Sequence, residues 1–224
     1  MASRPIFIPC HEGGAFVLKQ DVEFQWHPGM SINQKRRSIR SLHEASVVQP
    51  VLEISSKSES AFGQSLSAFN LHLLVNQDSH PVENWFQASK SEFQGSGFPH
   101  LLTKHPREGG RFFREKEAFQ LHHFHHQGRD YPLVPQTAFY DWIYVSALMQ
   151  ESNLASDLGS YGGFSDIEFN PKRSINCQAK SAALYCGLVR AGKLENAMLS
   201  WENFVRVCYA NESSSDKGML PGFS

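Results

Sequence analysis

The stretch Pro81–Lys90, which reads PVENWFQASK, decides how the rest of the sequence is interpreted. Proline suits the first position of a helix, because its φ is already helical and its missing N–H is not needed there. Wound as a helix, the stretch has a mostly apolar stripe formed by Val82, Trp85, Phe86 and Ser89. A neighbouring face carries Glu83, Gln87 and Lys90. The pattern predicts an amphipathic helix. Its polar face is either exposed to solvent or lines a cleft with an acid, an amide and an amine.

The composition indicates a globular protein with a substantial core. Aromatic residues make up 12% of the 224 residues, with 17 Phe, which is enough to fill such a core. The net charge of −1 excludes a globally basic nucleic-acid binder but leaves room for a local basic patch. No apolar run reaches membrane-spanning length, and the opening MASRPIFIPC is too short for a signal peptide, so we expect a soluble cytoplasmic protein. We expect reduced thiols at the four cysteines, Cys10, Cys177, Cys186 and Cys208.

The first third of the chain predicts short strands around one helix. Two extended segments, Pro5–Ile8 and Val22–Trp26, are joined by a turn-prone stretch that contains two glycines. Ser31 is expected to cap a helix that ends near Ala45. Further strands are predicted at Val51–Ser55 and, with the clearest alternation in the chain, at Ser65–Val75.

The rest of the chain is predicted to be mainly helical. Leu101–Glu117 reads as a loop with a short helix, whereas Thr137–Glu151 is apolar nearly all round and should be the central core helix. Further helices are predicted around Leu154–Leu158 and at Asn176–Arg190, Leu194–Leu199 and Trp201–Tyr209. We expect one domain over residues 1–210, followed by a frayed polar tail over 211–224.

The predicted helix after Ser31 is strongly basic. It carries Lys35, Arg36, Arg37 and Arg40, with no acidic residue before Glu44. Such a cluster is often a solvated face, but four cations on one helix also suit phosphate groups. The pattern leaves both interpretations open.

A histidine cluster, LHHFHHQG, contains His122, His123, His125 and His126. Imidazole is a common metal ligand, but the sequence shows no carboxylate or thiolate that converges on these rings. In a strand, alternation would also split the histidines between two faces. We therefore expect no metal site here.

Several motifs occur together as they do in one known family. The shared pieces are Leu66–Asn70, Val82-Glu83 with Gln87-Ala88-Ser89-Lys90, Asp166 with Asn170, and Asn176 with Leu188–Arg190. Longer stretches that point to a subgroup are RPIFIP, WHPGMSINQKRRSI, PQTAFYDWIYVSAL and SDIEFNPKRSINCQAKSAAL. On these residues the chain resembles the NADAR (YbiA-like) family, and within it the antitoxins associated with DarT-type DNA ADP-ribosyltransferase toxins. The resemblance covers most of residues 4–208, with 4–60 as a subgroup-specific part that includes the basic helix. Two stretches depart from it, Pro106–Arg114, where an Ala-Lys pair is expected, and LHHFHHQG.

The resemblance implies both a fold and an activity. The fold is α+β, predominantly helical, a single-domain YbiA-like/NADAR fold with a few short strands. The activity is that of a hydrolase that removes ADP-ribose from guanine in DNA, or in RNA, and so reverses the modification made by a cognate toxin. ADP-ribose is then a product, and no cofactor, metal or membrane is called for. The catalytic residues implied are Lys90, Glu83 and Asp166.

Elementary chemistry gives these three residues distinct roles. Glu83 and Asp166 are acid/base candidates for cleaving a bond between a ribose carbon and a purine nitrogen. Lys90, desolvated beside Trp85 and Phe86, is able to attack an open-chain sugar as a Schiff-base nucleophile, or to supply positive charge only. Plainer roles are a surface lysine for Lys90 and a dipole-stabilised helix-start acid for Glu83.

Candidate substrate-binding residues divide by the part of the ligand that they suit. Cations suit the pyrophosphate, aromatic rings suit a base and asparagines suit ribose hydroxyls, although aromatic rings more often fill a core and asparagines often serve turns. The candidates are Lys35, Arg36, Lys57, Ser67, Phe69, Asn70, Trp85, Asn170 and Asn176, followed by Trp142, Lys172 and Arg173.

Two other functions stay open. One is an N-glycosidase that acts on a small ribosylated metabolite, such as a riboflavin-pathway intermediate. The other is a non-enzymatic antitoxin that binds ADP-ribosylated DNA or the toxin itself. A strong basic face favours a nucleic-acid substrate, whereas burial or neutralisation of its cations favours the metabolite.

Overall fold

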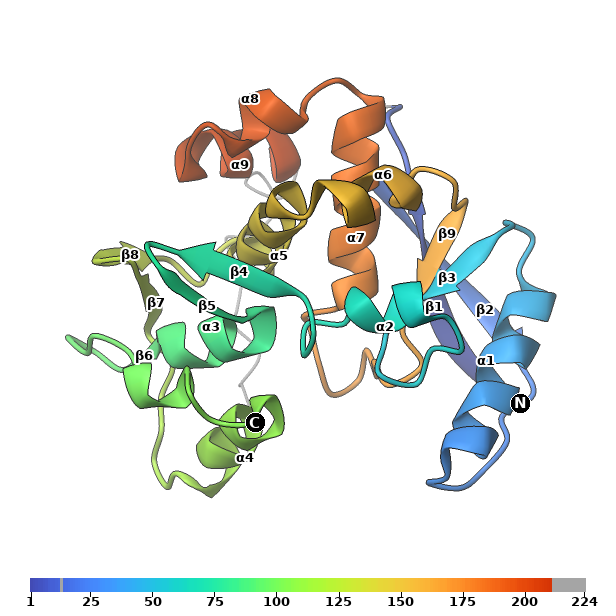
Figure 1. Ribbon diagram of the computed structural model, residues 1–224, viewed down its shortest axis with the longest axis horizontal. Helices are drawn as coiled ribbons and strands as arrows, with labels where there is room; N and C mark the ends of the chain where they lie inside the picture. The colour runs from blue at the N-terminus through green and yellow to red at the C-terminus, as the bar shows by residue number, and fades with distance from the viewer. Residues whose placement is uncertain (13, 211–224) are drawn as a thin grey trace.

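A computed structural model describes residues 1–12 and 14–210 of the chain. Its largest sheet is built from β1 (Ala2–Pro9), β2 (Val17–Phe24), β3 (Val51–Glu53) and β9 (Gly163–Ser165). The strand order is β2-β1-β9-β3, so segments from distant parts of the sequence lie side by side (Figure 1). β9 runs antiparallel to β1 and parallel to β3, and Glu53 is paired with Ser165. The sheet therefore brings the ends of β3 and β9 to the same place.

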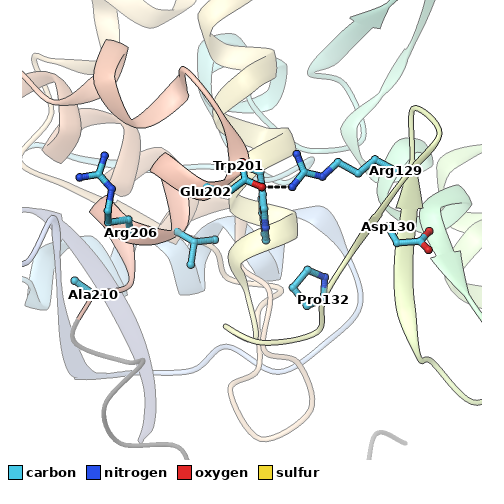
Figure 2. A pocket seen from close by; sticks show the side chains of 8 residues that line it. Arg129, Asp130, Pro132, Trp201, Glu202, Arg206 and Ala210 are labelled. Carbon is cyan, nitrogen blue, oxygen red and sulfur yellow. Dashed lines mark hydrogen bonds and ion pairs between the residues drawn. The ribbon is translucent and has the colours of Figure 1, made fainter.

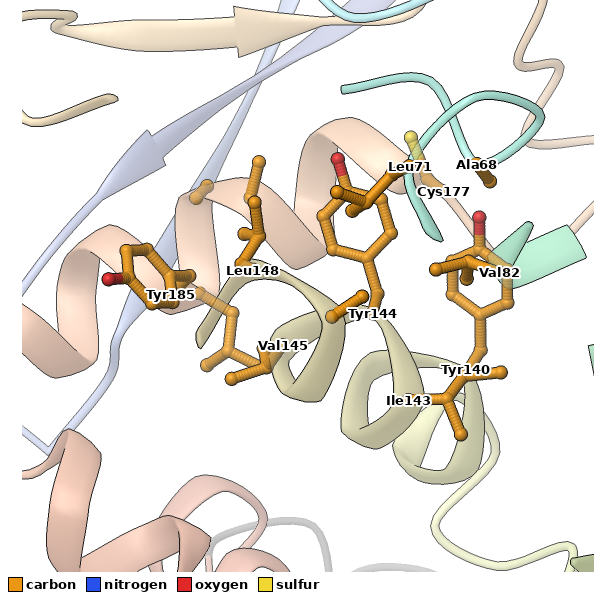
Figure 3. Packing of buried hydrophobic residues seen from close by; sticks show 14 of the residues in the cluster. Ala68, Leu71, Val82, Tyr140, Ile143, Tyr144, Val145, Leu148, Cys177 and Tyr185 are labelled. Carbon is orange, nitrogen blue, oxygen red and sulfur yellow. The ribbon is translucent and has the colours of Figure 1, made fainter. Parts of the chain in front are cut away.

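Two helices, α5 (Ala138–Gln150) and α7 (Gln178–Arg190), pack against each other at the centre of the molecule (Figure 1). Figure 3 shows α5 directing side chains such as Tyr144 and Leu148 into the apolar cluster that surrounds both helices. α7 lies closely on the β1–β2 hairpin because position 187 is a glycine. A Cβ there would come within 2.1 Å of the Phe16 carbonyl oxygen.

A buried carboxylate ties the central helices together. Asp141 of α5 is fully buried and accepts a hydrogen bond of 2.5 Å from Ser181 of α7. The Lys180 ammonium lies 3.2 Å from the same carboxylate, and the Tyr209 hydroxyl donates to it. The buried charge is thus both paired and hydrogen-bonded, as a charge in the interior requires.

Two smaller sheets flank the helix that carries the PVENWFQASK motif. The strands are β4 (His72–Val75) and β5 (Asp78–Pro81) in one sheet, and β6 (Lys90–Ser91), β7 (His123–His126) and β8 (Arg129–Tyr131) in the other. β5 leads directly into α3 (Val82–Ser89), and β6 follows α3 at once. The motif helix is therefore held at both ends by sheet hydrogen bonds.

The remaining helices are α1 (Ile32–Ala45), α2 (Ala61–Ser65), a 3-10 helix (Pro99–Leu101), α4 (Pro106–Glu115), α6 (Ser152–Leu158), α8 (Leu194–Met198) and α9 (Trp201–Cys208). The predicted cap of α1 is confirmed, since the Ser31 hydroxyl accepts the Gln34 amide at 3.3 Å. Among the described residues, no helix is both long and apolar enough to cross a bilayer.

The predicted α+β, predominantly helical domain is confirmed, but two elements differ from expectation. Only the last part of the strand predicted at Ser65–Val75 is a strand. Before it the amides of Asn70 and Leu71 both donate to the Ser67 carbonyl at 2.7 Å, which makes a turn. Pro106–Glu115 is a full helix, because Pro106 starts it and the His105 ring accepts the Arg107 amide. The predicted tail over 211–224 lies outside the described residues.

Candidate functional site

The motif helix α3 buries its apolar stripe as predicted and places its polar residues on one side. Trp85 is buried, and its indole N–H donates to the Leu73 carbonyl of β4 at 2.8 Å. The helix begins one residue later than expected, with Pro81 as its cap, and Lys90 lies just beyond its end. Lys90 has extended backbone angles and is paired with Phe124 of β7. The lysine is therefore fixed by a sheet and not by a last helical turn.

Glu83 and Gln87 form a fixed pair on α3. Gln87 Nε2 donates to Glu83 Oε1 at 2.8 Å, and the Glu83 amide donates to the Ala68 carbonyl at 2.9 Å. Helix α4 holds Gln87 in place, since a Cβ at Gly109 would come within 2.8 Å of the Gln87 side chain. Burial raises the pKa of Glu83, while the Gln87 hydrogen bond and the nearby Lys90 charge act against that rise. Glu83 thus keeps its proton to higher pH than an ordinary glutamate.

Lys90 has an amine between two aromatic rings. Its Nζ lies 5.2 Å from the ring centre of Phe86 and 4.7 Å from that of Phe113 on α4. Within the described part of the chain, no carboxylate oxygen lies within 4 Å of this nitrogen. The pKa of Lys90 is lowered to about 8, mainly by burial; the charge of Glu83 opposes this shift and the charge of Arg114 adds to it. Part of the amine is therefore neutral near physiological pH, which is the state that a nucleophile needs.

Arg114 is the cation on α4 that stands beside this site. Its Nη1 would lie 3.5 Å from a Cβ at Gly110, and the Gln87 amide nitrogen would lie 3.9 Å from the same point. Arg114 is exposed, and among the described residues no hydrogen bond or ion pair occupies its guanidinium. Pro106–Arg114 was noted from the sequence only as a departure from the family pattern. In the structure this segment places the exposed Arg114 guanidinium next to Lys90.

Asp166 follows the last residue of β9 and is 8% exposed. Its Oδ1 accepts the amides of Glu168 at 2.9 Å and Phe169 at 3.2 Å, and its Oδ2 accepts Gln178 Nε2 at 2.9 Å. Burial raises the pKa of Asp166, and the neighbouring Glu53 carboxylate raises it further. The pKa of buried Glu53 is raised as well, mainly by burial. Two carboxyl groups this close and this buried favour holding a proton at neutral pH.

Gln178 connects Asp166 to α3. Besides Asp166, its Nε2 donates to the Ile54 carbonyl at 2.7 Å, and its Oε1 accepts the Ala68 amide at 2.7 Å. The Ala68 carbonyl in turn accepts the Glu83 amide. One side chain therefore links the two predicted acids through a single residue, Ala68. Gln178 was not among the predicted site residues, although it stands in the subgroup stretch SINCQAKSAAL.

Tyr140 also belongs to this region, although its sequence context indicated only a core residue. Its ring meets Phe86 edge-on with 5.2 Å between centroids, and Figure 3 shows its hydroxyl pointing toward Val82 and Ala68. Burial raises the pKa of the Tyr140 hydroxyl well above its ordinary value, and the Glu83 and Asp166 charges raise it further. Tyr140 thus brings a permanently protonated donor close to both acids.

The basic helix α1 is partly neutralised. Lys35 lies 3.1 Å from Glu168, next to Asp166, and its Nζ is 5.0 Å from the ring centre of Trp26. Arg40 is held by Glu59 through two hydrogen bonds. Arg36 has a buried Nε without a partner in the described structure. The structure thus places Lys35 and Arg36 as predicted on one helix, of which only part remains free for a phosphate.

Other predicted binding residues lie on the turns around Ala68. Ser67 is buried and its hydroxyl accepts the Phe69 amide at 3.4 Å. Phe69 is partly exposed, and exposed Asn70 donates to the Gln64 carbonyl at 2.8 Å. Lys57 is partly buried, and its backbone amide donates to the Ser55 hydroxyl at 3.1 Å. Phe69 remains the one aromatic candidate on this side with a partly exposed ring.

Trp85, Asn170 and Trp142 serve the fold in ways the motif did not reveal, whereas Asn176 keeps an unused acceptor. Trp85 meets His126 edge-on at 5.2 Å on the core side of α3, so its ring faces away from solvent. Asn170 accepts the Lys172 amide at 3.0 Å and stabilises a turn. Asn176 has a buried Oδ1 without a partner in the described structure, so an acceptor remains available there. Trp142 packs against Trp201 and Phe204 in the core.

The candidate residues lie apart from the two clearest hollows of the surface. One hollow of about 510 Å³ lies between β8 and α9, where the Arg129 guanidinium bonds Glu202 beside Trp201 (Figure 2). The other, of about 430 Å³, lies among α5, α6 and α7. Neither contains Glu83, Lys90 or Asp166. The candidate site is therefore identified by the chemistry of its side chains and not by a hollow in the surface.

Comparison with protein families identifies one to which the chain is similar. The family model described as DarT1-associated NADAR antitoxin matches residues 2–218, a span that contains Glu83, Lys90 and Asp166. No curated protein matches the chain.

Proposed function

Because the chain belongs to the family of DarT1-associated NADAR antitoxins, we propose that it is a hydrolase that removes ADP-ribose from guanine bases in DNA. Such a reaction breaks the bond between the anomeric ribose carbon and a guanine nitrogen. It needs support for the charge at that carbon and a proton for the departing nitrogen. The observation that carries the proposal is the Lys90 amine, which lies between Phe86 and Phe113 with a lowered pKa and an acid, Glu83, in its vicinity.

In the proposed route Lys90 acts as the nucleophile. With the ribose ring open, Lys90 Nζ forms a bond to the anomeric carbon, and the bond from that carbon to the guanine nitrogen breaks. Glu83, whose pKa is raised by burial, supplies the proton that the guanine nitrogen takes with it. Water then adds to the imine that joins Lys90 to the sugar, and the bond to Lys90 breaks to release ADP-ribose and the free amine.

Asp166 and its surroundings supply the second acid/base group. Its raised pKa suits a group that exchanges a proton with the sugar ring oxygen or with water. Tyr140, whose hydroxyl feels the charges of both acids, is proposed as a hydrogen-bond donor to the substrate, and Gln178 positions Asp166. A direct hydrolysis by Glu83 and Asp166 as a carboxylate pair, with Lys90 supplying only charge, is the competing route.

The charged part of the substrate is proposed to lie between two groups of cations. Arg114 lies next to Lys90, and Arg107 and Lys104 are exposed at the start of α4. Lys35 lies on the opposite side, beside the Asp166 loop, whereas Arg36 is assigned to the phosphates of the nucleic-acid strand. Guanidinium groups bind the pyrophosphate well because their donors match its oxygens in pairs. A DNA or RNA strand would add backbone phosphate contacts along the same surface.

One observation favours a second candidate, hydrolysis of a small ribosylated metabolite. Glu168 and Glu59 neutralise two of the four cations on α1, which weakens that helix as a phosphate-binding face. A small substrate would need only the Lys90 site. The toxin itself is also a proposed partner, because the matching family is named for its association with DarT1.

The test is turnover on a DNA oligonucleotide that carries ADP-ribose on one guanine. A small amount of protein should release many equivalents of free ADP-ribose and leave unmodified guanine. Release limited to one equivalent, or tight binding without release, would contradict an enzymatic function and favour a binding antitoxin. Release only from ADP-ribosyl-guanosine would favour the small-molecule substrate.

A further inference from the structure

The hairpin β7–β8 gathers two histidines and one aspartate on one face. Its two-residue turn has left-handed angles, φ 53° at Gln127 and φ 71° at Gly128, as tight hairpins require. The register pairs His125 with Asp130, so their side chains stand directly opposite each other. His123 is two residues before His125 and therefore shares its face.

The three side chains converge on one point. His125 Nδ1 lies 2.6 Å from Asp130 Oδ1, and His123 Nε2 lies 3.3 Å from the same oxygen. One nitrogen or oxygen from each of the three residues lies within 4.8 Å of the others. The sequence pattern did not predict that a carboxylate converges on the histidine cluster. It comes from across the turn, where only the hairpin register could bring it.

We propose that His123, His125 and Asp130 form a binding site for a divalent transition-metal ion of the zinc class. Two imidazole nitrogens and one carboxylate oxygen are a ligand set that Zn²⁺ accepts, with water in the remaining positions. Tetrahedral ligands at about 2.0–2.2 Å from zinc lie roughly 3.3–3.6 Å apart, so the present positions need only small adjustments.

Each ligand is prepared for this role. Asp130 Oδ1 is the oxygen that both rings already face, so it is directed toward the point where an ion would bind. His125 would coordinate through Nδ1 with its proton on Nε2, and His123 through Nε2 with its proton on Nδ1. In doing so His123 gives up its 3.2 Å contact with the Gly95 carbonyl. The carboxylate and the two rings would exchange hydrogen bonds for metal bonds.

The site is open to an ion and separate from Lys90. The side chains of His123, His125 and Asp130 are 17%, 27% and 66% exposed. Figure 2 shows the Asp130 carboxylate pointing away from the hollow into which Arg129 extends. Lys90 is paired with Phe124, the residue between the two histidines, so its side chain leaves β6 on the other face. A bound ion would therefore act on the hairpin and not on the chemistry at Lys90.

The test uses the full chain without a histidine tag. Isothermal titration with Zn²⁺ should show one ion per chain, and Co²⁺ in its place should give visible absorption of nitrogen and oxygen ligands without a thiolate charge-transfer band. Asp130→Asn, a change at an exposed side chain that does not threaten the fold, should weaken binding about tenfold or more. His123→Asn with His125→Asn should abolish it. His122→Asn, an exposed neighbour outside the group, is the matched control and should bind as the unaltered chain does.

Several results would overturn the proposal. A Kd for Zn²⁺ weaker than about 100 μM would mean that the three side chains only hydrogen-bond one another. Binding that persists in the Asp130→Asn chain and in the histidine double variant would place the ion elsewhere. A thiolate band with Co²⁺ would assign it to a cysteine.

Discussion

Asp166 accepts a hydrogen bond of 2.9 Å from Gln178, and this contact fixes the acid after β9 to the first turn of α7. The same glutamine side chain accepts the Ala68 amide, and the carbonyl of Ala68 accepts the Glu83 amide at the start of α3. The relative position of Glu83 and Asp166 therefore depends on Gln178, which is not itself an acid.

Gln178→Ala should reduce both stability and activity. It leaves the Ala68 amide and one Asp166 oxygen without their partner, which should lower the free energy of unfolding by about 1–3 kcal/mol. Urea denaturation measures that loss, and release of ADP-ribose should fall with it. Gln120→Ala, at an exposed position, is the control and should stay within about 0.5 kcal/mol of the unaltered chain. Equal stability of the two variants would show that the link through Gln178 is unimportant.

Asp166→Asn should separate chemistry from folding. Asparagine can keep the contacts with the Glu168 and Phe169 amides and loses only the acceptor for Gln178 Nε2, which retains its bond to the Ile54 carbonyl, so the fold should survive, but it cannot exchange a proton. We expect ADP-ribose release to fall about 100-fold or more while circular dichroism is unchanged. Glu168→Gln changes an exposed acid in the same loop and should have a small effect. A rate near that of the unaltered chain in Asp166→Asn would remove Asp166 from the proposed mechanism.

Replacing Arg36 and Arg37 with serine tests α1 as a nucleic-acid surface. These are the two cations of the cluster that no carboxylate neutralises in the described structure. Binding of a modified oligonucleotide should weaken and its salt dependence should flatten, while hydrolysis of ADP-ribosyl-guanosine stays nearly intact. Arg40→Ser, at a cation already held by Glu59, is the matched control. An equal effect on both substrates would instead place the pair in the ADP-ribose pocket or in the fold.

Arg114→Ala should move the pH dependence of the reaction. Lys90 is reactive as the neutral amine, so kcat should rise with pH and level off above about 8, the pKa of Lys90. Removing the Arg114 charge takes away an influence that lowers this pKa, so the rising limb should shift to higher pH. Arg114→Lys keeps the charge and should keep the profile, and Arg111→Ala, at a cation paired with Glu115, is the control. An unshifted profile in Arg114→Ala would mean that Arg114 does not act on Lys90.

Local patterns predicted much of the fold because they report burial directly. The apolar stripe of PVENWFQASK, the continuous apolar surface of α5 and the Ser31 cap all correspond to contacts that the structure makes. The pattern failed at Ser65–Val75, where apolar residues alternate but the Ser67 carbonyl closes a turn. Alternation records which residues are buried and not whether a strand or a turn buries them.

The arrangement of the site was less accessible from sequence, because it depends on contacts between distant segments. Glu53 and Asp166 meet only because β3 and β9 pair, and Gln178 meets Ala68 only because α7 packs beneath that turn. Arg114 was hidden in a segment whose pattern looked irregular. Trp85 was expected to lie beside the Lys90 amine, but its ring faces the core. Phe113, which is far from Lys90 in sequence, contacts the amine instead. Such pairings follow from tertiary structure and have no local signal.

Lys90 is the proposed nucleophile, and trapping with borohydride tests this role most directly. The protein is incubated with guanine-ADP-ribosylated oligonucleotide and borohydride, and its peptides are weighed by mass spectrometry. We predict a reduced adduct with ADP-ribose on the peptide that contains Lys90. Lys90→Arg should be as inactive as Lys90→Ala, because a guanidinium stays protonated and forms no imine. An active Lys90→Arg variant together with no trapped adduct would contradict the account and leave catalysis to Glu83 and Asp166.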